Sequence, residues 1–142
     1  MPLTTTRELS AVFRLHAHPA EIARARELTR QALADWGLSD HADLAQLIVT
    51  ELATNALQHG TGPIPVRLSY YAGDLWTEVH DDGPGRPVRQ HHTPEAEHGR
   101  GLALIDALIA LHGGTAGVVD DPDSPGKTVY VAVPVTGSDG GS

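Results

Sequence analysis

The chain has 142 residues and a net charge of −8. A chain of this length can bury roughly 70% of its unfolded surface, which is enough for one hydrophobic core, so we expect a single domain. The absence of cysteine excludes disulfides, thiolate metal sites and a cysteine nucleophile, and it agrees with a cytoplasmic location. The acidic charge disfavours direct binding to nucleic acid. We expect neither a signal peptide nor a membrane span.

The first half of the chain predicts a strand, two helices and a hairpin. Residues 7–15 alternate between apolar and polar side chains, as in a half-buried strand. Residues 19–36 carry an apolar stripe at helical spacing, and a second helix is expected from Ser39 or Asp40 to about His59. Two further runs, 64–71 and 75–81, are predicted to pair across a short turn.

The second half predicts a long loop, a helix and a second pair of strands. Residues 82–100 lack periodicity and are rich in glycine, proline and histidine, which is typical of a functional lid. Residues 101–111 are apolar almost all round and predict a buried helix. The strands are expected at 115–119 and 128–133, and 137–142 at a flexible tail.

This element order predicts an α+β fold. Strands joined mainly by hairpins, with the helices in blocks, favour a two-layer α/β sandwich. We expect a mixed, mostly antiparallel sheet with about three helices on one face. The domain is expected to cover residues 1–136.

The second helix carries polar side chains in register with its apolar stripe. Glu51, Asn55 and His59 follow one another at spacings of four and are predicted to face inward. Burying a carboxylate without a partner costs several kcal/mol, about the cost of a serious core defect, so a purely structural helix would avoid it. One such residue is more simply explained as lying at the core edge, but three in register favour one wall of a binding site.

A second wall is expected where the predicted hairpin ends. Asp81 continues the inward side of its strand and begins the motif Asp81-x-Gly83-x-Gly85. Glycines allow close approach of a ligand to the backbone, and a carboxylate beside them can accept a hydrogen bond from an exocyclic amino group. An ordinary turn after a strand is the simpler alternative for this motif alone.

A third feature is the segment Gly99-Arg100-Gly101-Leu102, which opens the apolar helix. The free N–H groups and positive dipole end of a helix N-terminus attract anions such as phosphate. A hinge for the preceding loop is compatible with that role. Arg100 is left open between a phosphate contact, a partner contact and solvent.

Other chemistries lack support in the sequence. Gly126-Lys127-Thr128 is not a phosphate-binding P-loop, because the first glycine of that motif is missing and a strand follows. No serine-hydrolase motif is present. His91, His92 and His98 lack the spacing of metal ligands, so we do not expect zinc.

Taken together and in order, these motifs resemble the four nucleotide-binding boxes of the GHKL ATPase superfamily, and the compact length resembles its stand-alone anti-sigma-factor serine kinases. That resemblance implies a Bergerat-type sandwich that holds ATP and Mg²⁺ under a mobile lid. The motifs that carry it are Glu51-x-x-x-Asn55-x-x-x-His59, Asp81-x-Gly83-x-Gly85, Gly99-x-Gly101-Leu102 and Gly126-x-Thr128.

The resemblance implies distinct roles for these residues. Asn55 is implied to bind Mg²⁺, Glu51 to act as general base, and His59 to contact phosphate. Asp81 is implied to accept a hydrogen bond from the adenine amino group, with Thr128 helping through water. The remaining implied nucleotide contacts are Gly83 and Gly85 at the adenine end and Gly99, Arg100, Gly101 and Leu102 at the phosphates.

The leading functional prediction is an ATP-dependent serine/threonine protein kinase and anti-sigma factor. By resemblance it is expected to be a homodimer, to sequester a sigma factor and to phosphorylate an anti-sigma antagonist. A second prediction is a non-catalytic switch in which ATP orders the lid and so controls a protein partner. A third is a structural domain without a ligand.

Overall fold

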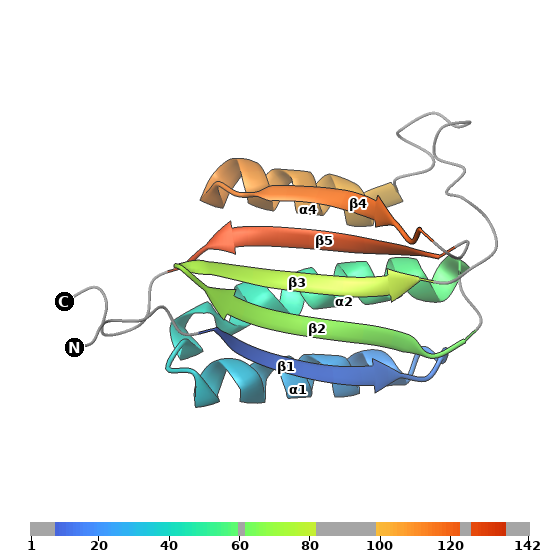
Figure 1. The fold of residues 1–142 in the computed structure, drawn as a ribbon, viewed down its shortest axis with the longest axis horizontal. Helices are drawn as coiled ribbons and strands as arrows, with labels where there is room; N and C mark the ends of the chain where they lie inside the picture. The colour runs from blue at the N-terminus through green and yellow to red at the C-terminus, as the bar shows by residue number, and fades with distance from the viewer. Residues whose placement is uncertain (1–7, 60–61, 82–98, 123–125, 136–142) are drawn as a thin grey trace.

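The computed structural model describes residues 8–59, 62–81, 99–122 and 126–135. A five-stranded sheet forms one layer, with strand order β1-β2-β3-β5-β4 and every described pair antiparallel (Figure 1). The predicted α+β sandwich is therefore confirmed, with a sheet that is antiparallel throughout the described residues rather than mixed. The strands are β1 (Leu9–Leu15), β2 (Ile64–Tyr71), β3 (Asp74–Asp81), β4 (Thr115–Asp120) and β5 (Lys127–Pro134).

Helices cover one face of this sheet and leave the other open (Figure 1). The described helices are α1 (Glu21–Asp35), the short 3-10 helix η1 (Ser39–His41), α2 (Ala42–His59) and α4 (Gly99–His112). The boundaries lie within about two residues of those expected from the sequence, the usual uncertainty of helix ends. The 3-10 turn η1 accounts for the region where either Ser39 or Asp40 was expected to begin the second helix.

The core lies between α1, α2 and the inner face of the sheet. In β3 the burial alternates strictly, so that Leu75, Thr77, Val79 and Asp81 are buried and face the helices. The buried stripe of α2 meets them from the other layer, and α2 also packs against α1. The members of that stripe are Ala45, Ile48, Val49, Leu52, Ala53 and Ala56.

The turn between β2 and β3 fixes the register of the hairpin. Ala72 and Gly73 connect the pair Tyr71–Asp74, with φ of 55° and 88° respectively. Positive φ at both central residues is the type I′ geometry, whose twist matches that of paired strands. Because this register sets which side chains face the helices, it also places Asp81 on the inner face.

The prediction that the apolar helix 101–111 is buried is wrong. In α4 only Ile105 is fully buried among the side chains that are described, and Leu111 is 76% exposed. Among the described elements, the helix packs mainly on α2 and β5. An apolar composition predicts burial only when other elements surround a helix, and Figure 1 shows α4 at one end of the helical layer, behind the edge strand β4.

Some expectations lie outside the described residues. These are most of the predicted lid, with Gly83 and Gly85, and the tail at 137–142. They remain predictions, as does the domain boundary at residue 136.

Candidate functional site

The second half of α2 supplies the predicted acid and amide. Glu51 and Asn55 are each half-buried and lie beside the buried stripe, one turn apart. The sequence predicted that they face inward along one wall of a site, and the structure places them at the border of the core. A border position leaves a carboxylate and an amide accessible to a ligand while the helix stays anchored by its apolar side. The helix ends at His59, as expected.

Asp81 forms a buried ion pair that the sequence motifs did not predict. Lys127 is its register partner across β3 and β5, and the Lys127 Nζ atom donates a hydrogen bond of 2.8 Å to Asp81 Oδ2. The two side chains are 5% and 2% exposed. Lys127 is also the only lysine in the sequence. A buried pair of charges is costly to form and is weak evidence for stability, so its presence here calls for a reason.

Thr128 lies on the opposite face of the sheet from Asp81. Its hydroxyl is 3.3 Å from Nδ1 of His80, its partner in the adjacent strand. Strand alternation explains this placement, because Lys127 shares the inner side with Val129 and Val131 while Thr128 points outward. The structure therefore does not support the implied contact of Thr128 with adenine, and Lys127 takes the inward position at this point of β5.

Gly126, the residue before β5, packs closely against His80 and Asp121. A Cβ atom there would lie 2.8 Å from Asp121 Oδ2 and 3.0 Å from the His80 ring, so a larger residue would displace both. The Asp121 amide donates to the Gly126 carbonyl at 2.9 Å, which closes the connection between β4 and β5. The glycine of the fourth motif thus has a packing role.

The predicted walls of the site converge at one end of the molecule. The second half of α2, the last residue of β3, the start of β5 and the start of α4 all lie toward the right of Figure 1. α4 begins at Gly99, so its N-terminal end is directed to the same region as Asp81. The side chains of His59, Arg100 and Leu102 are not described, and their roles remain predictions.

The donor set at this end fits magnesium bound through a nucleotide. Mg²⁺ takes oxygen ligands, keeps several waters and is usually held by one or two protein oxygens together with substrate phosphates. Asn55 offers an amide oxygen and Glu51 a carboxylate one turn away. Within the described ranges, no three His, Asp or Glu side chains gather as a metal centre of their own.

The clearest pKa shifts among the described residues lie elsewhere, on the outer surface of α1. Hydrogen bonds from Arg30 and Gln31 lower the pKa of Glu27 to about 2. A hydrogen bond from the His16 backbone N–H lowers the pKa of Glu21. Each acid belongs to an ion pair within α1, Glu27 at an exposed position and Glu21 at a partly buried one, so these shifts reflect local pairing on the helix.

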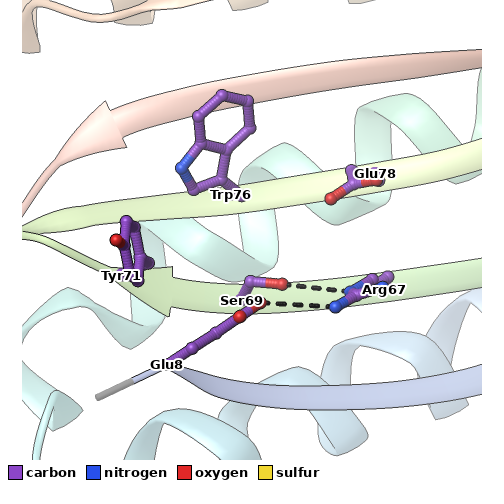
Figure 2. Close-up of a pocket in the computed structure, with 6 residues that line it drawn as sticks. All are labelled: Glu8, Arg67, Ser69, Tyr71, Trp76 and Glu78. Carbon is purple, nitrogen blue, oxygen red and sulfur yellow. Dashed lines mark hydrogen bonds and ion pairs between the residues drawn. The ribbon is translucent and has the colours of Figure 1, made fainter. Parts of the chain in front are cut away.

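A shallow pocket lies on the open face of the sheet, away from the site just described. Figure 2 shows Arg67 at one side of this pocket, where it donates hydrogen bonds to Ser69 Oγ and Glu8 Oε2, each at 3.3 Å. Trp76 lines the same pocket and packs against Tyr130 with ring centroids 5.7 Å apart. This face has aromatic rings and paired charges but none of the motif residues from α2 or α4.

The fold and the ordered site residues agree with one family of ATPases. Residues 40–137 match the model of the histidine kinase-, DNA gyrase B- and HSP90-like ATPases. The matched span contains Glu51, Asn55 and Asp81 and covers most of the chain. The chain therefore belongs to this family, and it is an ATPase-type, kinase-like domain of the GHKL superfamily.

Its relatives are sensor histidine kinases. The chain is 31% identical to the sensor histidine kinase component HK1 of Mycobacterium tuberculosis, over 84% of this chain and 79% of that protein. It is 30% identical to the sensor histidine kinase PdtaS of the same species, over 78% of this chain and 23% of the relative. The sensor histidine kinase DcuS of Escherichia coli is 38% identical over 63% of this chain and 19% of its own length.

A solved structure shows the same fold. The histidine kinase domain of the blue-light activated histidine kinase from Erythrobacter litoralis aligns with a TM-score of 0.55 and 22% identity. The match covers 82% of this chain and 60% of that one. As for membrane association, none of the helices in the described ranges is both long and apolar enough to cross a bilayer.

Proposed function

We propose that this chain binds Mg-ATP between the second half of α2, Asp81 and the start of α4, and transfers the γ-phosphoryl group to a partner protein. The observation that carries the proposal is Asp81, a buried carboxylate at the end of β3 on the face covered by α2. The acid and amide of α2 border that same face, within the span that matches the ATPase family.

The proposed chemistry assigns one task to each residue. Asn55 contributes an oxygen ligand to magnesium, and the magnesium neutralises charge on the phosphates when it is bound. The Glu51 carboxylate takes the proton from the attacking hydroxyl. As the new O–P bond forms to the γ-phosphorus, its bond to the bridging oxygen breaks and ADP leaves.

The proposed acceptor is a serine or threonine of an anti-sigma antagonist, with a sigma factor as the sequestered partner. The strong negative charge of the chain favours a partner with a basic surface. Glu51 suits this acceptor, because a neutral hydroxyl must lose its proton as it attacks.

A second candidate is the ATP-binding component of a histidine kinase whose acceptor histidine is on another chain. One observation favours it: HK1, a relative whose name describes a component, is covered over 79% of its length. The two candidates differ in the product, because phosphohistidine is labile in acid whereas phosphoserine is stable there.

The test is phosphotransfer from radiolabelled ATP to purified candidate partners. Glu51→Ala should lose transfer by at least about 100-fold, the usual contribution of a general base, while ATP affinity is retained. The matched control is Asp43→Ala, which removes an exposed carboxylate from the same helix and should leave transfer unchanged. Acid treatment of the product separates the two acceptors.

If ATP binds tightly but no partner is phosphorylated, the non-catalytic switch is the correct function. In that case ATP should still change partner capture in a pull-down, because ligand binding alone shifts the conformation that the partner recognises. Loss of transfer in Asp43→Ala as well as in Glu51→Ala would contradict the base role.

We further propose a homodimer formed through the open face of the sheet. Apolar side chains on this face are exposed, including Val12 at 67% and Val119 at 56%. Arg67 and Glu78 face each other across β2 and β3, so a second copy related by a two-fold axis can pair with them reciprocally.

Val12→Glu should convert the dimer to a monomer, measured by sedimentation equilibrium. The new carboxylate would be buried in the interface without a partner, which should destabilise the dimer by about 3–5 kcal/mol. Leu111→Glu is the matched control, because Leu111 is also an exposed apolar residue, at 76%, but lies on α4. A wild-type monomer at every concentration tested, or dissociation by both variants, would count against this interface.

A further inference from the structure

Lys127 is an unexplained charged group at the candidate site. It is the only lysine of the chain, and its side chain is 5% exposed. Lysine is almost never fully buried unless its ammonium is paired, because the ammonium is strongly hydrated in water. The chemistry proposed above makes no use of it.

The hydrogen bonds of this ammonium are incomplete in the described structure. An ammonium carries three N–H donors and no acceptor. Asp81 is the partner that Lys127 has among the described residues, through Oδ2 at 2.8 Å. A buried ammonium with donors to spare is stabilised by a further acceptor, and none of the neighbouring apolar side chains on the inner face of β5 can provide one.

The pair also has the right spacing to hold two adjacent atoms of a base. A carboxylate oxygen and an ammonium nitrogen 2.8 Å apart present an acceptor and a donor side by side. The Watson–Crick edge of adenine presents the complementary order, with the N6 amino donor next to the N1 acceptor. Guanine presents an acceptor at O6 and a donor at N1, the reverse order.

We infer that Lys127 is a base-specificity residue, which donates a hydrogen bond to N1 of adenine while Asp81 accepts from the N6 amino group. This inference rests on the proposed binding of ATP and adds the atom on the base that Lys127 reads. With Asp81 beside N6, guanine is rejected because it places O6 against the carboxylate and N1–H against the ammonium. Two mismatches of this kind leave buried polar groups unpaired.

The test compares ATP with an analogue that lacks N1 and follows the NMR signal of the single lysine side chain. Calorimetry compares Mg-ATP with Mg-1-deaza-ATP, in which a C–H group replaces N1. The wild type should bind the analogue about 10- to 100-fold more weakly, the range expected for one hydrogen bond to a charged group. Lysine labelled with ¹⁵N at the ammonium gives one side-chain NMR signal, which ATP should shift strongly and 1-deaza-ATP weakly.

A variant completes the comparison. Lys127→Met should bind ATP and 1-deaza-ATP with the same affinity, because the donor is gone. The measurement is made at a temperature where circular dichroism shows the variant folded. The calorimetric and NMR comparisons of ATP with 1-deaza-ATP use wild-type protein, so they test the inference even if Lys127→Met does not fold.

The outcomes separate the inference from the function on which it rests. Wild-type protein that binds ATP and 1-deaza-ATP equally tightly overturns the role of Lys127 and leaves ATP binding intact. A preference for GTP over ATP also overturns it, because the pair then reads guanine in the opposite orientation. If neither ATP nor GTP binds, the proposed function itself fails.

Discussion

Asn55→Ala is expected to abolish the magnesium dependence of ATP binding without disturbing the fold. Asn55 is half-buried within α2, and alanine is the most favourable residue for a helix interior. If Asn55 holds magnesium as proposed, the variant loses this oxygen ligand, so magnesium can no longer add to the affinity for the nucleotide. Calorimetric titrations with ATP, in magnesium and in EDTA, should then give the same dissociation constant.

Two further variants sharpen this experiment. Gln58→Ala changes an exposed amide on the same helix and should keep the wild-type response to magnesium. Asn55→Asp retains an oxygen ligand and should restore part of the magnesium dependence. An Asn55→Ala protein that still binds ATP more tightly with magnesium would show that the ion is held elsewhere.

Lys127→Met is expected to destabilise the protein by about 3–5 kcal/mol, the range for a buried ion pair that loses one partner. The loss arises because Asp81 is left as a charged group in a site that is 2% exposed, without its ammonium. Denaturant unfolding followed by circular dichroism measures the change, which should appear as a lower midpoint with a similar slope.

The controls use the second charge of the pair and a surface pair. Replacing both residues, as Asp81→Asn with Lys127→Met, should recover much of the loss, since no unpaired charge remains. Arg30→Met removes the cation from an exposed pair with Glu27 and should cost less than about 1 kcal/mol. Equal losses for Lys127→Met and Arg30→Met would contradict the burial of the Asp81–Lys127 pair.

The fold could be predicted largely because its signals are local. Apolar alternation located the strands, and helical spacing with glycine stops located α1 and α2. The burial of α4 could not be predicted in the same way. Its composition shows which residues are apolar, whereas their exposure depends on how many described elements pack against the helix, and these are mainly α2 and β5.

The candidate site was predictable residue by residue only where motif and periodicity agreed. Glu51 and Asp81 satisfied both criteria. At the fourth motif the spacing Gly126-x-Thr128 pointed to Thr128, while alternation with Val129 and Val131 places Lys127 on the inner face. This alternation was visible in the sequence, but a lysine is normally expected at a solvent-exposed position. Its partner Asp81 is also 46 residues away in the sequence.

The one-sided packing of α4 has a consequence for how the proposed phosphate end of the site behaves. Because Ile105 is its one fully buried residue among the described side chains, we expect local unfolding of this helix to require less free energy than unfolding of α2. The wall formed by α2 and β3 can therefore stay intact while the α4 wall opens. Entry and departure of a ligand at that end are then governed by a local event, on a timescale separate from the lifetime of the folded state.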